Sequence, residues 1–343
     1  MFWKYSWRDS VPLSITLMQL MLNFWLAATW EHRTLSQNLL FAPFCLFLFW
    51  YNGLVASHNF VHTPWFKADW LNRVYMALNS LNIGLPQAYY RYEHLIHHRY
   101  VNDRRGHDGQ TQDPTSLFAY GQNGQPENLV SYCLLGPFRT NLLESFQTIH
   151  RKGEARQLYV ELATCGIGFA SYLVLSWQYF LFLFIPIFYL GWVLEHLENY
   201  YEHFGSIPEN RFANSTSYYG QFYNALFCNE GYHQEHHLRP GMHWTKRLQT
   251  RQELRAELDS VNRVILRFPP VLAWLDHQRI VQQYRSPLPI TISDIISSEV
   301  ISPDIVSSNI VSSDIVNLGI MTSDISDSDF IGSDMIASEV AVL

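Results

Sequence analysis

Four apolar runs constrain this chain more than any other feature of its sequence. The runs near 11–30 and 39–57 are separated only by the polar stretch EHRTLSQN, and a third apolar block covers 158–194. That block is too long for one helix and divides naturally near Trp177 and Gln178. Because a helix needs roughly 20 apolar residues to cross about 30 Å of hydrocarbon, we predict four membrane-spanning helices in two hairpins.

The same runs could instead be core helices of a soluble helical protein. The uninterrupted run of Phe, Leu and Ile at 180–190 speaks against this alternative, because most helices of soluble proteins keep a polar face. The composition agrees, since 48% of the residues are hydrophobic and only 15% are charged. We therefore predict an all-α integral membrane protein.

The distribution of charge predicts the orientation of the spans. Residues 63–157 contain ten lysines and arginines, whereas the loops at the other end of the spans offer only Arg33. By the positive-inside rule, both termini and the region between the hairpins lie in the cytoplasm, where they form a helical cap on the spans. We interpret 75–90, which is only moderately apolar, as a re-entrant or interfacial helix.

The end of the chain has a different composition. Residues 286–343 hold nine acids and no lysine or arginine, which leaves 23 basic and 21 acidic residues in 1–285. This balance, without a clustered basic face, predicts no nucleic-acid partner. The end of the chain repeats five-residue units such as SDIIS and SEVIS, which weakly resemble pentapeptide repeats, but we predict a disordered acidic tail. We therefore divide the chain into a membrane domain, 1–285, and a tail, 286–343.

Ten of the fifteen histidines fall in four clusters beside the predicted spans. HNFVH follows the second span, HLIHH lies between the hairpins, and HLENYYEH and HQEHH follow the fourth span. Residues i and i+3 or i+4 share one face of a helix, so each cluster can present two or three side chains to one point. The clustered histidines are His58, His62, His94, His97, His98, His196, His203, His233, His236 and His237.

The number of imidazoles predicts more than one metal ion. A tetrahedral zinc takes about four protein ligands, whereas eight or nine clustered histidines are available here. Imidazole-rich sites without thiolates suit iron, zinc, copper or nickel. We predict iron, because such a site beside a membrane suits redox chemistry on an apolar substrate. The other histidines are interpreted as ordinary core or surface residues.

The boxes HNFVH, HLIHH and HQEHH, in this order around two hairpins, resemble those of the integral-membrane fatty acid desaturase and hydroxylase superfamily. The resemblance covers roughly residues 10–250. It implies a centre of two iron ions that uses O2 as co-substrate to remove hydrogen from an unactivated C–H bond of a lipid acyl chain. The implied metal ligands are His58, His62, His94, His97, His98, Asn199, His203, His233, His236 and His237.

The resemblance leaves the product open. A fatty acid desaturase is our preferred prediction, but NYYEHFG at 199–205 resembles a motif of membrane alkane hydroxylases. GYHQEHHLRPGMHW at 231–244 is similar to carotenoid ketolases and to decarboxylases that form terminal alkenes. In another class, a zinc-binding membrane receptor or hydrolase would use fewer histidines than this chain offers.

The remaining expectations concern partners and supporting residues. At least one of the glutamates beside the histidines is expected to orient an imidazole through its second ring nitrogen; the candidates are Glu195, Glu198, Glu202 and Glu235. The sequence shows neither an H-P-G-G heme motif nor a G-x-G-x-x-G dinucleotide motif. The resemblance therefore implies an external electron donor, either ferredoxin or cytochrome b5, besides a fatty acyl lipid or fatty acid as substrate and the surrounding membrane lipid.

Overall fold

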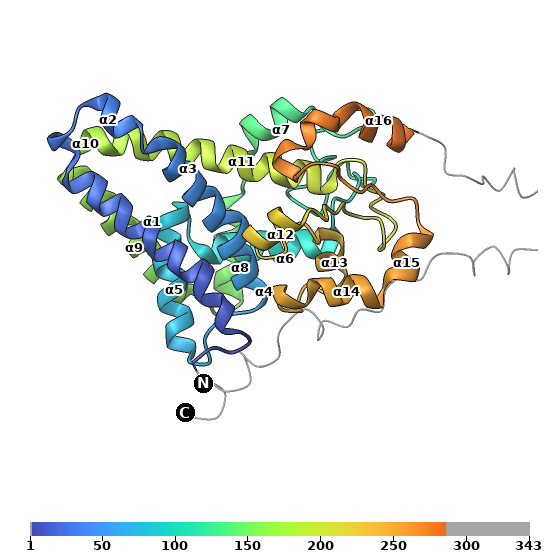
Figure 1. Ribbon diagram of the computed structural model, residues 1–343, viewed down its shortest axis with the longest axis horizontal. Helices are drawn as coiled ribbons and strands as arrows, with labels where there is room; N and C mark the ends of the chain where they lie inside the picture. Colours follow the sequence, from blue (N-terminus) through green and yellow to red (C-terminus); the bar gives the residue numbers. More distant parts are fainter. Residues whose placement is uncertain (1, 286–343) are drawn as a thin grey trace, which may run out of the picture. The chain divides into compact units, whose positions relative to one another are not determined.

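Four long helices form two hairpins in the computed structural model, which describes residues 2–285 (Figure 1). Their length and composition are sufficient to cross a membrane, and residues 2–285 contain no β-strand. The prediction of an all-α membrane protein with four spans in two hairpins is thereby confirmed. The predicted tail, 286–343, lies outside the described residues.

The first hairpin joins two spans, and only the second of them contains a π-helix. The helix Trp7–Ala28 contains α1 (Ser10–Ala28) and is followed by a second span, Leu35–His62. The second span is longer than predicted, because the helix continues beyond residue 57 to the end of the first histidine box. Its segments are α2 (Leu35–Leu39), α3 (Ala42–Tyr51), the π-helix η3 (Asn52–Ser57) and α4 (His58–His62).

The second hairpin repeats this arrangement. It consists of α9 (Ala155–Leu175) and the span Trp177–His203, which also continues past the predicted apolar run. Leu26, Phe49 and Tyr172 are buried where the two hairpins pack against each other. The second span of this hairpin is built from α10 (Trp177–Tyr179), the π-helix η5 (Phe180–Phe184) and α11 (Ile185–His203).

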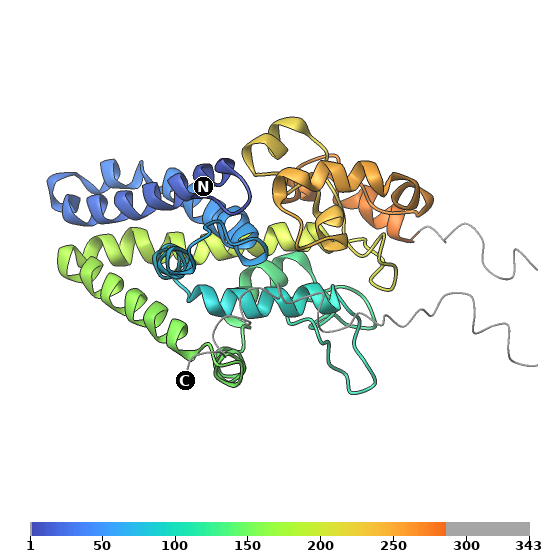
Figure 2. The same ribbon diagram turned by 90° about the horizontal axis from the view of Figure 1, so that it is seen from below.

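The tips of the two hairpins lie together, on the side away from α4, which carries His58 and His62 (Figures 1 and 2). The rings of Trp30 and Tyr179 are 5.9 Å apart there, and the Tyr179 hydroxyl donates a hydrogen bond to Asn23. Both hairpins therefore enter and leave the predicted membrane region at one level. This topology brings the ends of α4 and α11, which carry His62 and His203, to the same level.

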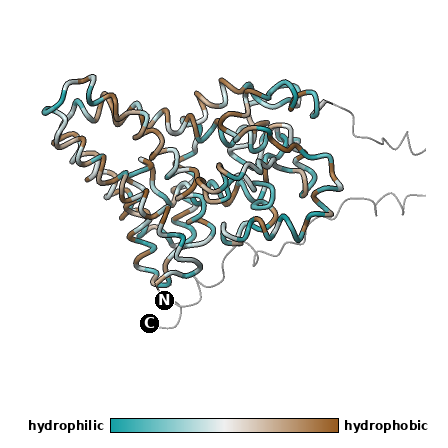
Figure 3. Tube along the Cα trace, viewed as in Figure 1, coloured by the Kyte–Doolittle hydropathy of each residue, from teal (hydrophilic) through white to brown (hydrophobic). Residues whose placement is uncertain are grey.

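The remaining helices cover that level. Hydrophobic residues follow the two hairpins, whereas the last helices of the cap are mostly hydrophilic (Figure 3). Tyr200 and Tyr201 of α11 are buried against residues of the C-terminal part, such as Leu266 and Ile280. The helices between the hairpins are α5 (Asp69–Ile83), α6 (Gln87–Tyr100), α7 (Leu129–Leu135), the 3-10 helix η4 (Gly136–Phe138) and α8 (Leu142–Arg151). Those after α11 are α12 (Gln221–Leu226), α13 (His233–Leu238), η6 (Trp244–Lys246), α14 (Arg247–Glu253), α15 (Arg255–Ser260), η7 (Pro270–Asp276) and α16 (His277–Arg285).

We predicted one helix over residues 75–90, but this stretch contains parts of two helices. α5 ends at Ile83, and Gly84 follows in the left-handed conformation with φ at 68°. Pro86 then precedes α6. A left-handed glycine commonly terminates a helix, and a proline two residues later cannot continue that helix, so these two residues account for the break.

Gly84→Ala is expected to lower the thermal unfolding midpoint of the purified protein in detergent. An L-residue in the left-handed conformation costs roughly 1–2 kcal/mol, and a Cβ at Gly84 would also come within 2.4 Å of the Phe188 ring. Gly109→Ala is the matched control, because Gly109 has φ at 77° but nothing within 4 Å of the added Cβ. An equal loss of stability in both variants would contradict the steric part of this prediction.

Candidate metal centre

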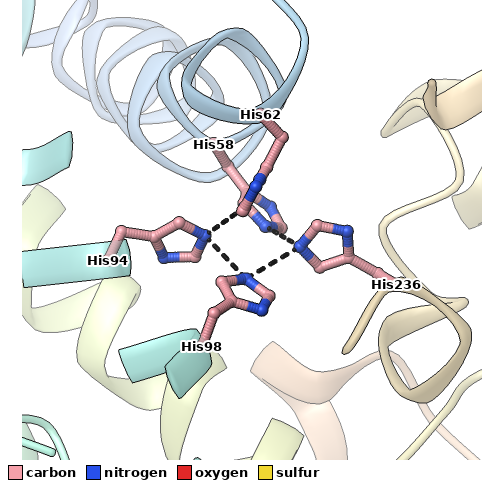
Figure 4. Close-up of side chains that lie close together, drawn as sticks. All are labelled: His58, His62, His94, His98 and His236. Carbon is pink, nitrogen blue, oxygen red and sulfur yellow. Dashed lines mark hydrogen bonds between the residues drawn. The ribbon is translucent and has the colours of Figure 1, made fainter. Parts of the chain in front are cut away.

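Five histidines from three helices form a first group (Figure 4). His58 and His62 come from α4, His94 and His98 from α6, and His236 from α13. Their Nε2 atoms converge: His58 and His236 are 2.7 Å apart, His62 and His94 2.8 Å, and both His94 and His236 lie 3.0 Å from His98. These helices are remote in sequence, so only the tertiary fold assembles the group.

Four further histidines form a second group. His97 comes from α6, His203 is the last residue of α11, and His233 and His237 come from α13. The Nε2 atom of His233 lies 3.2 Å from that of His203 and 3.0 Å from that of His237. Nε2 of His97 is buried without a hydrogen-bond partner.

Two helices contribute to both groups. On α6, His94 and His98 are four residues apart and share the face that turns to the first group, whereas His97 turns to the second. The groups adjoin, because the rings of His98 and His237 stack with their centroids 4.3 Å apart. The corresponding residues of α13 are His236 for the first group and His233 and His237 for the second.

A buried ion pair supports the first group from behind. Glu230, fully buried, places a carboxylate oxygen 2.7 Å from Nδ1 of His58 and 2.8 Å from the guanidinium of Arg247. Asn59 donates a hydrogen bond to its other oxygen at 2.6 Å. Burial alone would raise the pKa of Glu230, but Arg247 and His58 hold it below its ordinary value. The carboxylate is therefore charged and fixed behind the ring of His58.

Carboxylates also contact the second group. Asp113 accepts a hydrogen bond at 2.8 Å from Nδ1 of His97 and another at 2.7 Å from the backbone NH of Asn102. Burial works against the charge on Asp113, yet the contact with His97 keeps its pKa below the ordinary value. Glu202 lies 3.2 Å from Nδ1 of His233. Carboxylates at the outer nitrogen fix the orientation and tautomer of an imidazole.

Five of the imidazoles outside the spans are uncharged at neutral pH. Burial is the largest cause, and neighbouring histidines add to it. A neutral imidazole keeps one lone pair, which is the form that binds a metal ion. The pKa is held well below its ordinary value in His94, His98, His233, His236 and His237.

The tautomers of the histidines indicate that a cation fits between their rings. Nδ1 of His203 lies 3.2 Å from the carbonyl oxygen of Asn214, and Nδ1 of His97 lies 2.8 Å from Asp113, so both Nδ1 atoms are placed to carry the proton. Their Nε2 atoms then present lone pairs within the second group, and Nε2 of His97 is buried there without a hydrogen-bond partner. A cation would accept these lone pairs, so these residues fit a metal ion, and a donor set of imidazoles suits iron.

The glutamates singled out in the sequence lie in different environments. Glu202 faces His233, whereas Glu198 accepts a hydrogen bond from Tyr223 and Glu235 accepts from Ser217 and Tyr219. One carboxyl oxygen of Glu195 is buried without a hydrogen-bond partner. Close to Glu195, a Cβ added to Gly53 would come within 2.2 Å of that oxygen.

Asn199 lies one turn before His203 on α11, as predicted from the spacing. Its amide donates a hydrogen bond at 2.5 Å to the hydroxyl of Tyr132, and both residues line the cavity described below. Tyr132 donates in turn to the carbonyl oxygen of Thr115, whose own hydroxyl is 3.1 Å from Nδ1 of His97. The structure thus connects Asn199 to the second group through a chain of polar contacts.

Sequence reasoning missed Glu230, Asp113 and Arg247. The candidates were chosen because they adjoin histidines in the chain, but Asp113 is 16 residues from His97 and belongs to an irregular segment. Glu230 does lie three residues before His233, yet it contacts His58, far away in sequence. A search for acids near each box would have found Glu230 without indicating its partner.

A cavity of about 530 Å³ adjoins both groups. This volume is within the range of about 300–1,000 Å³ that is usual for small-molecule pockets. Its wall on α11 changes from aromatic side chains at Phe188 and Trp192 to polar side chains at Asn199 and Glu202. His58 and His94 of the first group and His97 and His233 of the second also line it.

A known protein family matches most of the membrane domain. Residues 34–268, more than half of the chain, match the family described as fatty acid desaturase. No match is found among curated proteins or among solved structures. The matched residues include both histidine groups and the carboxylates that contact them.

Proposed function

This chain belongs to the fatty acid desaturase family, and from this premise we propose that it is an O2-dependent oxidoreductase with two iron ions, one in each histidine group. The preferred reaction is the desaturation of a lipid acyl chain. One observation supports this proposal most: two adjoining groups of buried imidazoles contribute to the wall of a largely apolar cavity. A single zinc ion takes about four protein ligands, so nine histidines in two groups favour two metal ions over a one-zinc receptor or hydrolase.

The cavity supports an uncharged chain as its occupant. Among the residues lining it there is no lysine or arginine to neutralise a carboxylate or phosphate. Leu54, Leu85 and Phe188 offer apolar walls instead, and burial raises the pKa of Glu93 to about 7. A charged headgroup would thus stay outside while the hydrocarbon chain lies beside the histidines.

The residues of the chain have three tasks in this reaction. Glu230, Asp113 and Glu202 hold the imidazoles in one orientation from behind. The aromatic wall of α11 positions the substrate chain and excludes water from the reacting carbon. Bound iron would supply the activation of O2 that an unactivated C–H bond requires. Reduction of O2 to water during desaturation also consumes electrons, for which we propose an external donor, ferredoxin or cytochrome b5.

We also propose that the histidine groups and both termini face the cytoplasm. The support is the excess of lysine and arginine between the hairpins, at 63–157, over the single arginine, Arg33, near the hairpin tips. The shared level of the two hairpin tips is consistent with one orientation for all four spans.

Product analysis tests the reaction. Cells that express the intact chain are expected to contain lipids with a new double bond, and cells that express His97→Ala should lack it. All lipid-soluble products are identified by mass, because a hydroxyl group, a keto group or a terminal alkene would instead assign the chain to hydroxylation, ketolation or decarboxylation. Zinc in the purified protein together with an unchanged lipid profile would contradict the proposal.

A further inference from the structure

A short segment between the hairpins exposes large apolar side chains. It covers α7, η4 and the beginning of α8, and its six outward-facing residues are between 42% and 75% exposed. Soluble surfaces rarely concentrate so many large apolar side chains in a continuous patch without a partner. We call these residues the apolar rim: Val130, Leu134, Leu135, Phe138, Leu142 and Leu143.

The apolar rim is continuous with a membrane-spanning helix. The hydroxyl of Tyr189 on α11 donates a hydrogen bond at 3.1 Å to the carbonyl oxygen of Leu134. The ring of Phe138 lies 5.7 Å from the ring of Tyr189. Because Tyr189 belongs to the span Trp177–His203, the rim packs directly beside a surface that lipid covers.

The charged side chains near the rim point away from the apolar patch. Arg139, inside the segment, turns to Glu127 at 2.7 Å and stacks over Tyr120, so it does not interrupt the apolar patch. On α8, Glu144 and Arg151 share an exposed face, whereas the exposed apolar residues Leu142 and Leu143 belong to the apolar rim. A helix with this division can lie along the bilayer surface with its charges toward water.

The same segment also lines the cavity. Pro137, Phe138, Thr140 and Leu142 form part of its wall, together with Tyr189. Phe138 is 75% exposed and Leu142 47% exposed, so both residues face the exterior as well as the cavity. They therefore form the mouth of the cavity, and the outer surface of this mouth is apolar.

We propose that the apolar rim is embedded in the lipid bilayer and that the cavity opens sideways into it between Phe138, Leu142 and Tyr189. The occupant of the rim is the bilayer itself, because the rim continues the lipid-covered surface of α11. Exposed to water, the patch would lose the favourable free energy that covering its apolar surface with lipid provides. An apolar substrate then reaches the histidines without crossing water. This last step rests on the proposed function, whereas the contact with the bilayer does not.

Spin labels test the contact with lipid. Leu135→Cys and Leu143→Cys of the full chain are labelled with a nitroxide in lipid nanodiscs, and His107→Cys in an exposed polar loop is the matched control. The native cysteines are all buried, and the unsubstituted protein gives their background labelling. We expect collisions with dissolved O2 to exceed collisions with a water-soluble nickel chelate several-fold at residues 135 and 143, and the reverse at 107. Equal access of the nickel chelate to all three positions would overturn the proposal.

Substrate access is tested separately. Phe138→Asp places a carboxylate at the mouth and is expected to raise KM several-fold for a substrate dissolved in the bilayer, with little change in kcat. Phe138→Leu keeps the mouth apolar, so its KM should rise far less than that of Phe138→Asp. An unchanged KM in Phe138→Asp would overturn the sideways opening. Failure of the proposed function would appear differently, as absence of product in every variant while the spin-label pattern persists.

Discussion

The double variant His62→Ala/His94→Ala is expected to lower bound iron from two ions to one per chain and to abolish lipid oxidation. Nε2 of His62 and of His94 are 2.8 Å apart in the first group, which would keep only three imidazoles. The second group shares no histidine with the first, so its ion should remain. Iron is counted by mass spectrometry in the purified protein, and products are identified in the same cells.

The matched control replaces two exposed histidines outside both groups. His32→Ala/His107→Ala removes the same number of imidazoles, and neither residue belongs to a group. This control should keep both iron ions and full activity. Circular dichroism checks that both double variants remain folded. Two iron ions retained in His62→Ala/His94→Ala, or both lost in a folded protein, would contradict two separate sites.

The membrane topology was predictable because it depends on length and hydropathy alone. A continuous run of about 20 apolar residues can satisfy its backbone hydrogen bonds in lipid within a single helix. The ends of the spans were not predictable in the same way, since α4 and α11 extend beyond the apolar runs to His62 and His203. Their continuation depends on packing within the cap, for example of Tyr200 and Tyr201, and hydropathy does not report it.

The histidine boxes indicated that the histidines lie close together, but not which of them belong to the first group and which to the second. In HLIHH, both i+3 and i+4 are compatible with one helix face, so the sequence left His97 and His98 equivalent as partners of His94. The structure places His98 with His94 and turns His97 to the second group. This choice depends on where α4, α11 and α13 lie around α6, which is a property of the tertiary fold.

Supporting carboxylates were the least predictable part. Glu198 and Glu235 lie within two residues of a histidine in the sequence, yet their side chains contact Tyr223 and Tyr219. Adjacent residues on a helix point in directions about 100° apart, so closeness in sequence works against sharing a face. Glu230 contacts His58 from a different segment, and no local pattern marks such a pair.

Glu230→Met is expected to weaken iron binding by about 10–100-fold, as loss of a partner behind a metal ligand commonly does. It is also expected to destabilise the protein, because Arg247 would remain buried without its partner, and breaking a buried ion pair costs about 3–5 kcal/mol. Iron affinity is measured by competition with a chelator, and stability by thermal unfolding in detergent. Glu230→Gln retains an oxygen that can accept from Nδ1 of His58 and should lose less iron affinity than Glu230→Met.

The double variant Glu230→Met/Arg247→Met separates the two effects. Removing both charges leaves no unpaired buried ion, so the unfolding midpoint should recover much of the loss seen in Glu230→Met. Iron affinity should not recover, because Nδ1 of His58 still lacks the carboxylate that lies 2.7 Å from it. If iron affinity returned together with stability, Glu230 would act on the metal site only through folding. Weak iron binding in a stable double variant would instead establish Glu230 as the residue that positions His58.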